Sequence, residues 1–523
     1  MFTHRIFNHR HIYLFALLLL AVSLPLSMFG MSLASIILAA NWLLEGGFRE
    51  KWSRFIRTRG LWIFLMLYLV HVLWLIPSEN LLYGLHDLKI KLPLLVLPLI
   101  IGTSEPLSKK ELHYVLNAFI MAVVCATLIS TAIYLRAAPG QITNIRDISI
   151  FISHIRFGLM IVLSIFLLGM DIVMRIEPPN WLRIIRFMGM VWLMVFLLIL
   201  KSVTGLVITI VLGLGLGVMF FVKTRHVVLK YFVAALWLTA TFLMVWTGLR
   251  FHARYSYRVP IDFSSLETHT VNGRPYLHDT LNQQTENGYH TWLYMCEEEL
   301  EVSWTHRSTV EYSGRDENGN ELRHTLIRYL TSRGLPKDSL GISRLSNEEI
   351  QWIEQGVANV IFTEGYSLYR LFYELAWQID AYRQGGNPSG HSVTQRIEYM
   401  KAGWGIFLEN PIFGVGTGDV PDAFDRQYKT MHSMLSEEWR LRAHNQYLTF
   451  LISFGVVGFI VAIWAMFHPV FLQKGCTQFR FAVFLTIALL SMIPEDTLET
   501  SAGAMFISFF YAVLLFGTKS KIS

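Results

Sequence analysis

A histidine stands where residues suited to proton transfer and phosphate binding follow one another closely. His444 lies between Arg440 and Arg442 on one side and Asn445 and Gln446 on the other. Cations beside a histidine favour its neutral imidazole, which can accept a proton from a hydroxyl group. Arginine keeps its charge and binds phosphate oxygens through a planar fork of N–H groups. The segment therefore combines a candidate general base with candidate anion ligands, whereas a histidine taken alone would be read as an ordinary membrane-interface residue.

The residues upstream form a helix followed by a turn. Residues 392–409 have a helical pattern, carry Arg396 and end at Asn410-Pro411. Residues 414–419, with the sequence GVGTGD, lack the spacing and the preceding strand of a nucleotide-binding loop. We interpret them as a tight turn that lets the backbone approach a partner closely.

The elements that must position these residues are apolar. Of 523 residues, 53% are hydrophobic and only 16% are charged, far from the composition of soluble proteins. Apolar runs of about 17–25 residues recur, and each is long enough to cross a hydrocarbon core of ~30 Å. We interpret the first run as a retained helix, because it lacks a small-residue cleavage site and a second run follows at once. The predicted spans are 12–28, 30–45, 60–77, 83–102, 112–135, 151–171, 181–200, 202–222, 227–249, 445–469, 478–494 and 500–517.

Lysine and arginine residues in the short loops predict the orientation of these spans. Every second loop is basic, and the basic residues are Arg49, Lys51, Arg54, Arg57 and Arg59, then Lys109 with Lys110, Arg175 with Arg183 and Arg186, Lys223 with Arg225 and Lys230, Lys474 with Arg480, and Lys519 with Lys521. The alternation is satisfied when both termini and all the basic loops are cytoplasmic. The net charge of +6 is therefore a topology signal rather than a sign of nucleic-acid binding.

The same topology places one large segment, residues 250–444, on the periplasmic side. The expected fold is an all-α polytopic membrane protein with about twelve transmembrane helices. Residues 1–249 hold the spans before this loop, and residues 445–523 hold those after it. The loop is predicted to be a mixed α/β domain, β-rich over 262–345 and helical over 346–444, the part expected to be catalytic.

Composition and turn signals predict the strands of this loop. Thr291–Tyr294 and Leu300–Trp304 have strand-like content. Asp316-Glu317-Asn318-Gly319 is a hairpin-type turn, and it separates the predicted strands Val310–Tyr312 and Leu322–Tyr329.

Two further signals predict helices in the second part of the loop. Ser346 with Glu349 fits a helix capping box. A longer helix is predicted over 364–383, with Gly385-Gly386 as its stop. Its apolar stripe is interpreted as a packing face, with a position on the membrane surface as the alternative.

The order of these motifs resembles that of a known family. His444-Asn445-x-x-Leu448, followed by a span with Gly455-x-x-Gly458, is similar to the signature of the O-antigen ligase and O-antigen polymerase superfamily. Arg396, the run from Asn410 to Asp419 and the large loop before the tenth span resemble that family as well. The similarity is strongest over residues 390–460 and architectural elsewhere.

The resemblance implies a metal-independent membrane glycosyltransferase of the C-type class, without a cofactor. Such enzymes move a glycan from undecaprenyl diphosphate to an acceptor hydroxyl at the outer face of the inner membrane. His444 would then be the general base and Arg396 a catalytic diphosphate ligand. Outward segments contain no Asp-x-Asp and no His/Cys cluster with zinc spacing, which agrees with the absence of a metal.

One position departs from the family pattern. Where the family has an arginine near the outer end of the seventh and eighth spans, this chain has Lys201. Arg156 and Arg442 are the candidates that would compensate as diphosphate ligands, alongside Lys201 itself. Asn445, Asp419 and Tyr447 are the candidate supporting residues.

The expected partners are the lipid-linked glycan donor, an acceptor glycan and the lipid bilayer, in the bacterial inner membrane. Ligation to lipid A–core is the first expectation. A polysaccharide chain polymerase comes second and a protein O-oligosaccharyltransferase third, because the three differ only in the acceptor. Outside the enzymes, a transporter is the alternative, and it would need paired broken helices and a charged path at mid-membrane.

Overall fold

The computed structural model describes residues 8–136, 148–173, 180–223, 227–363 and 368–518. Arg175, Arg225, Lys519 and Lys521, which contribute to the predicted basic loops, lie outside these residues, as does the predicted start of the helix at 364. The chain divides into two compact units. The first comprises Met1–Lys223 with Gln395–Ser523, and the second comprises Thr224–Thr394.

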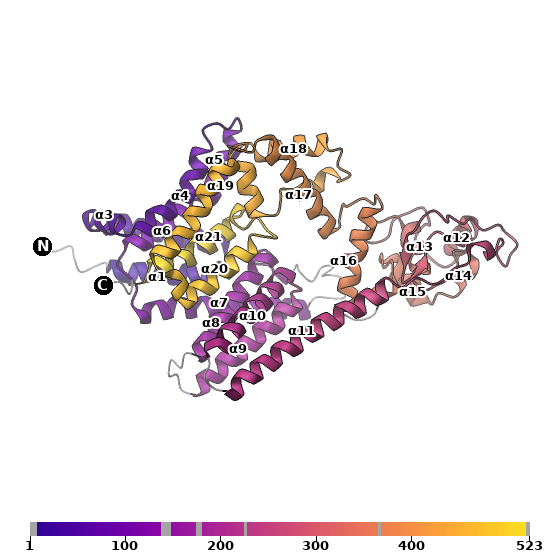
Figure 1. The fold of residues 1–523 in the computed structure, drawn as a ribbon, viewed down its shortest axis with the longest axis horizontal. Coiled ribbons are helices and arrows are strands. Elements are labelled where there is room, and N and C mark those ends of the chain that lie inside the picture. The colour runs from indigo at the N-terminus through magenta and orange to yellow at the C-terminus, as the bar shows by residue number, and fades with distance from the viewer. Residues whose placement is uncertain (1–7, 137–147, 174–179, 224–226, 364–367, 519–523) are drawn as a thin grey trace. The chain divides into compact units, whose positions relative to one another are not determined.

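The first unit is a bundle of helices (Figure 1). Each predicted apolar run in it contains a helix, and the fourth run is divided into two by Pro93, the first residue of α6. The helices are α1 (His9–Leu26), α2 (Met28–Leu44), α3 (Phe48–Arg57), α4 (Arg59–Leu73), α5 (Leu81–Lys91), α6 (Pro93–Thr103), α7 (Lys109–Arg136), α8 (His154–Val173), α9 (Asn180–Ile199), α10 (Val203–Lys223), α17 (Ser392–Glu409), α18 (Val420–Thr430), α19 (Gln446–Leu472), α20 (Phe479–Ser491) and α21 (Ser501–Tyr511).

Several of these helices are long and apolar enough to cross a membrane. Within the described residues there are five, namely α1, α7, α8, α9 and α19, or six if α2 and α3, which are bent by 111°, form one span. The mostly helical, little-sheet architecture confirms the predicted class of polytopic helical protein. The number of about twelve spans stays a prediction, because the other apolar helical stretches are shorter, namely Arg59–Leu73, Val203–Met219, Phe479–Ser491 and Ser501–Phe516.

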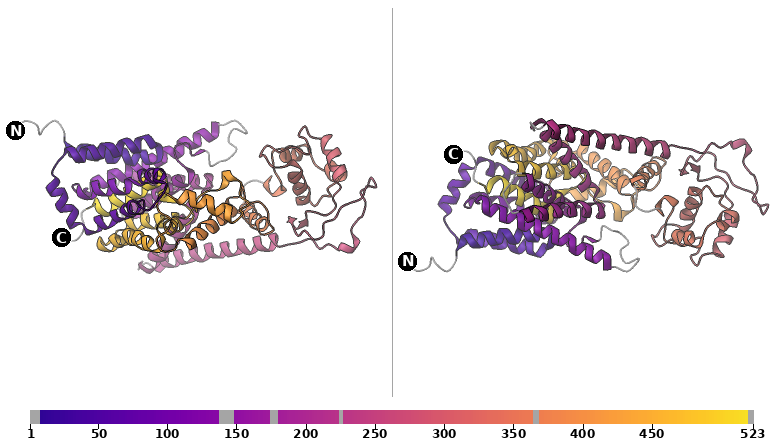
Figure 2. Two further views of the ribbon diagram at one scale, coloured as in Figure 1. Left: turned by 90° about the horizontal axis from the view of Figure 1, so that it is seen from above. Right: turned by 90° about the horizontal axis from the view of Figure 1, so that it is seen from below.

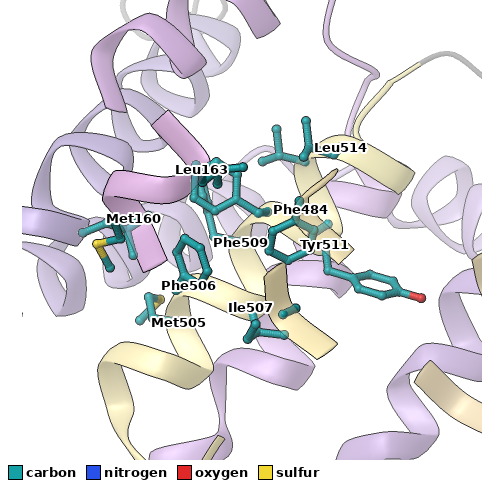
Figure 3. Packing of buried hydrophobic residues seen from close by; sticks show 14 of the residues in the cluster. Met160, Leu163, Phe484, Met505, Phe506, Ile507, Phe509, Tyr511 and Leu514 are labelled. Carbon is teal, nitrogen blue, oxygen red and sulfur yellow. The ribbon is translucent and has the colours of Figure 1, made fainter. Parts of the chain in front are cut away.

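Helices from the two ends of the sequence share one core. The indigo and yellow helices lie side by side in both views of Figure 2, as the contacts of α4 with α19 and of α6 with α21 require. Residues Ala502 to Tyr511 of α21 are all buried, as expected for a helix that is apolar on every side. Phe64 stacks on Tyr511 at 4.0 Å, and Phe119 meets Phe510 edge-on at 4.8 Å. Figure 3 shows how α8, α20 and α21 interlock there.

The glycine-rich turn is inserted into a break in α19. Gly455 has φ 60° and ψ −168°, which interrupts the helix. The open backbone groups are satisfied by the turn, since Val415 N donates to Ile452 O at 2.9 Å and Val456 N donates to Pro411 O at 2.8 Å. A Cβ on Gly414 would lie 2.5 Å from backbone atoms of α19. The close backbone approach predicted for this turn is confirmed, and the partner is the broken helix itself.

Replacement of Gly455 by alanine is expected to destabilise the protein. Its positive φ is strained for any other residue, at about 1–3 kcal/mol, and a Cβ would lie 2.2 Å from the carbonyl oxygen of Ile412. We expect Gly455→Ala to lower the melting temperature of the detergent-purified protein. Gly213→Ala is the matched control, because no atom lies within 4 Å of its Cβ position in α10. Equal melting temperatures for the two variants would contradict the close packing at Gly455.

The second unit is more helical than predicted. It contains α11 (Val227–Tyr255), α12 (Glu297–Thr305), α13 (Leu322–Ser332), α14 (Ser339–Ser343), α15 (Asn347–Glu354), α16 (Leu368–Arg383) and one antiparallel pair, β1 (Thr285–Glu286) with β2 (Tyr289–His290).

The predicted strands Leu300–Trp304 and Leu322–Tyr329 are therefore wrong, because they form α12 and α13. Among the described residues Thr291–Tyr294 and Val310–Tyr312 form no strand either. Leu300 with Trp304, and Leu322 with Leu326 and Leu330, are spaced at the helical interval and build one buried core. The β-branched and aromatic content of these short segments suggested strands, although their leucines are spaced as in a helix.

Other local predictions in this unit are confirmed. The Asp316–Gly319 turn is formed, with Gly319 at φ 82° and an isolated antiparallel bridge between Arg315 and Glu321. Ser346 and Glu349 make the capping box of α15.

Candidate active site

His444 is held in a fixed position just before α19. Its φ is +48°, and its backbone N–H donates to Asp496 Oδ2 at 3.1 Å. Asn445 caps α19 by accepting a hydrogen bond from Leu448 N at 2.9 Å. The imidazole therefore projects from a rigid junction between the loop and the helix.

A buried carboxylate joins His444 to Arg396. The Glu495 side chain is 3% exposed; its Oε1 accepts from Arg396 Nη2 at 2.5 Å, and its Oε2 lies 3.5 Å from His444 Nδ1. Within the described residues Nδ1 has no closer polar partner. The structure thus brings together the two residues that the sequence singled out first, on the two oxygens of one carboxyl group.

Helix α17 supplies both Arg396 and an aromatic face for the histidine. The ring of Tyr399, one turn after Arg396, stacks on the His444 imidazole with centroids 5.3 Å apart and an interplanar angle of 28°. Tyr399 is 2% exposed, so the stacking ring is itself fixed by packing. Ring stacking and the neighbouring carboxylate together restrict the imidazole to one orientation.

The two neighbouring acids differ in their electrostatics. Burial tends to raise the pKa of Glu495, but a hydrogen bond from His444 and the charges of Arg396, His444 and Arg156 lower it below its ordinary value. Burial and the charge of Glu499 raise the pKa of Asp496. Of these two acids, Glu495 is therefore the ionised one. Its carboxylate contacts Arg396 and lies beside His444.

A second group of charges lies behind the first. We call Asp87, Lys91, Arg442 and Glu499 the buried ion-pair network. Glu499 Oε2 accepts from Lys91 Nζ at 2.8 Å and from Arg442 Nη1 at 2.6 Å, and Lys91 also pairs with Asp87 at 2.6 Å. Two cations and two anions balance there, as buried charges require. The network ties the segment before His444 to α5.

Arg156 and Lys201 occupy neighbouring elements of the bundle. Arg156 is in the first turn of α8 and lines a hollow of about 430 Å³ with Met28, residues 149–153 and residues 500–502. Lys201 is in the turn between α9 and α10, at φ 51°. The next residue, Ser202, packs against α8, since a Cβ on Gly158 would lie 2.5 Å from its Oγ.

The three candidate supporting residues make hydrogen bonds within the protein. Asn445 caps α19, as described. Asp419 accepts hydrogen bonds from Asn80 N at 2.7 Å and Glu79 N at 3.0 Å, and Tyr447 donates to Leu489 O at 3.0 Å. These contacts fix the elements around the site.

Sequence reasoning missed the acids that organise the site. Glu495, Asp496 and Glu499 form a short acidic segment between the last two apolar runs, on the predicted periplasmic side. Asp87 and Lys91, four residues apart in an apolar run, were a second signal, because charges in such runs are costly and often functional. Among the described residues no group of three or more His, Cys, Asp or Glu could hold a metal ion. Metal independence remains a prediction.

The comparisons with known proteins agree with the motif order. The family model described as O-antigen ligase matches residues 355–463, which include Arg396, Asp419, His444, Asn445 and Tyr447. No curated protein matches the sequence. The apolar helices and this match indicate a multi-pass membrane protein with ligase- or polymerase-type glycosyltransferase ancestry. The O-antigen ligase family model therefore covers residues 355–463 of this chain, and the predicted resemblance to the O-antigen ligase superfamily is confirmed over that region.

Proposed function

We propose that this protein transfers a glycan from undecaprenyl diphosphate to an acceptor hydroxyl at the periplasmic face of the bacterial inner membrane, with lipid A–core as the acceptor. The observation that carries the proposal is the shared carboxylate. Glu495 holds a candidate base, His444, and a candidate diphosphate ligand, Arg396, on its two oxygens.

The chemistry follows from the positions of these groups. The acceptor oxygen attacks the anomeric carbon, the bond from that carbon to the phosphate oxygen breaks, and the electron pair leaves with undecaprenyl diphosphate. With Nδ1 directed at Glu495, the Nε2 atom of His444 is the one available to take the hydroxyl proton. Because diphosphate is a good leaving group, the main demand on the site is neutralisation of its growing negative charge.

Arginine meets that demand. A guanidinium has five N–H donors, so pairing through Nη2 leaves Arg396 with donors for phosphate oxygens. We assign Arg156, which lines the hollow beside residues 500–502, as the second diphosphate ligand. Lys201 would add a third cation from the α9–α10 turn. Arg442 is already paired with Glu499, so its proposed contribution is charge at longer range.

The distribution of charge in the first unit supports a periplasmic site. Two pairs of described basic segments lie next to each other: a Cβ on Gly60, beside Arg59, would lie 3.3 Å from Gln473 at the C-terminal end of α19, and Arg10 pairs with Glu111, beside Lys110. His444 precedes the opposite end of α19, which contains 27 residues and is broken at Gly455. With the basic end in the cytoplasm, the site faces the periplasm.

The rival classes are separated by one reconstitution experiment. Purified protein is given lipid-linked glycan donor and lipid A–core, with and without a chelator. Glycosylated lipid A–core supports the ligase, elongated donor alone indicates a polymerase, and inhibition by the chelator would contradict metal independence. Absence of any transfer would favour a transporter. Against that class, the break of α19 at Gly455 is filled by backbone hydrogen bonds rather than left open to an ion.

Glu495→Gln is expected to lower kcat on the order of 10–100-fold, the usual effect of losing a group that orients a functional histidine. The amide keeps the shape of the side chain but cannot stabilise the imidazolium. Because its neighbours lower the pKa of Glu495, the carboxylate stays ionised near neutral pH, and the loss of rate in the variant should be full there. The difference in kcat between the wild type and the variant should shrink as the pH falls through the pKa of Glu495, where the wild-type carboxylate loses its charge.

Glu409→Gln, at the exposed end of α17, is the matched control for this change and should keep the wild-type kcat at each pH. Glu495→Asp, which keeps the charge, should recover part of the rate. A wild-type kcat in Glu495→Gln would show that the charge of Glu495 takes no part in the transfer.

A further inference from the structure

The second unit contains a pocket that the proposed chemistry does not use. Its volume is about 910 Å³, and it lies between the C-terminal turns of α11 and the helix α16, which meet at an angle in Figure 1. Asn287, in the β1–β2 turn, completes the lining. None of the described residues that line it is acidic.

Two arginines one helical turn apart face this pocket. The guanidinium carbon of Arg250 lies 5.0 Å from the centroid of the Trp246 ring, and that of Arg254 lies 4.3 Å from the centroid of Tyr369. Within the described residues neither arginine has a carboxylate within ion-pair distance, and both are exposed. A guanidinium on a ring face keeps its N–H edge available to an anion.

Aromatic rings supply the rest of the surface. Trp246 is 47% exposed and Tyr257 is 58% exposed, so large ring faces are open to a ligand. Faces of this kind pack against the apolar C–H surfaces of sugar rings, and the hydroxyl of Tyr257 can form a hydrogen bond with a sugar hydroxyl. The side-chain amide of Asn287 is bonded to Ser332 O and Asn359 Oδ1, so it fixes the wall of the pocket. The lining thus matches a ligand that is at once saccharide and anion.

The frame of the pocket is rigid. Phe251 of α11 packs on Tyr369 and Phe372 of α16, with ring centroids 5.6 Å apart in each case. Tyr255 donates to Asp380 Oδ2 at 2.7 Å, which ties the same two helices together. A preformed site of this kind loses little conformational entropy when a ligand binds.

The length of α11 indicates where the pocket lies relative to the membrane surface. Its 29 residues extend about 43 Å, more than the ~30 Å of a hydrocarbon core. The span predicted to end at residue 249 leaves Arg250 and Arg254 just outside the apolar layer. At that level a membrane presents the headgroups of its lipids.

We propose that this pocket binds the phosphate-bearing saccharide head of a glycolipid. Binding of this head does not depend on the proposed transfer reaction. We further assign the glycolipid as the acceptor, and only that assignment rests on the proposed function. The phosphates would contact Arg250 and Arg254, and a sugar ring would lie against Trp246 or Tyr257.

The test is a binding measurement with full-length protein in nanodiscs of zwitterionic lipid. The probe is a delipidated, phosphorylated oligosaccharide of the lipid A–core type, followed by calorimetry and by the fluorescence of the protein. We expect the Arg250→Ala/Arg254→Ala double variant to bind at least ten times more weakly than the wild type. Arg383→Ala, an exposed arginine on α16, is the control and should bind normally.

Two further arms identify the source of the phosphate. Enzymatic dephosphorylation of the probe should weaken binding to the same degree as the double variant, and Trp246→Phe should remove most of the fluorescence response. Displacement of the probe by vesicles of anionic phospholipid would show that a phospholipid headgroup is the occupant and overturn the saccharide assignment. Equal binding by the wild type and the double variant would overturn the site. Because no transfer is measured, these outcomes are independent of the proposed reaction.

Discussion

His444→Ala is expected to reduce glycan transfer by about 10²–10⁴-fold, the range that general-base catalysis contributes. The acceptor hydroxyl is a poor nucleophile until its proton is removed, and Nε2 of His444 is the atom that we propose takes it. The measurement is the single-turnover rate with lipid-linked donor and acceptor in excess. His468→Ala, at the far end of the same helix, is the control and should transfer normally.

The left-handed backbone of His444 requires a second variant. Alanine at φ +48° is strained, whereas asparagine tolerates that conformation and is no base. His444→Asn should therefore fold like the wild type and still lose transfer. Added imidazole should restore part of the rate in His444→Ala if the lost group is a base. Wild-type rates in both variants would remove His444 from the mechanism.

Arg396→Ala is expected to lower kcat/KM for the donor by about 10²–10³-fold, the usual effect of removing a preorganised group from a developing negative charge. The loss should appear for the donor and leave the KM of the acceptor nearly constant, because the arginine is assigned to the diphosphate. Arg396→Lys should recover only part of the activity, since an ammonium lacks the planar fork.

This variant also leaves Glu495 without its ion-pair partner, which by itself disturbs the site. The double variant Arg396→Ala/Glu495→Gln removes the unpaired charge. If the diphosphate role is correct, the double variant stays deficient in donor binding. Recovery of donor KM in the double variant would show that Arg396 serves mainly to neutralise Glu495. Arg426→Ala, exposed on α18, is the control.

Much of the helical framework was predictable because its signals are local. The apolar runs all contain helices, residues 392–409 form α17, and the Ser346 capping box begins α15. Each depends on residues within a few turns of one another. The strands predicted in the second unit failed for the same kind of reason: β-branched and aromatic content is a weaker signal than the spacing of Leu322, Leu326 and Leu330.

The organisation of the site was only partly predictable. His444 and Arg396 were found because their motifs occur in a recognisable order. Glu495 and Glu499 were not, because their role exists only when distant segments meet: Glu495 lies 99 residues from Arg396, and Glu499 lies 408 residues from Lys91. A single sequence shows charges in apolar surroundings, but it does not show which of them pair.

The departure at Lys201 is likewise clearer in three dimensions. The turn that carries it packs beside the first turns of α8, where Arg156 is found. Arg156, on the neighbouring helix α8, can therefore compensate for the arginine that is missing at the α9–α10 turn. The substitution therefore leaves positive charge in that part of the bundle, as our assignment of the diphosphate ligands requires.

A structure of the protein with a polyprenyl diphosphate bound tests the central claim most directly. We predict diphosphate oxygens within hydrogen-bonding distance of the Arg396 guanidinium and beside Arg156, with Nε2 of His444 open to the face from which an acceptor would attack. A diphosphate bound among the basic segments at the other end of the bundle, or out of reach of both arginines, would contradict it.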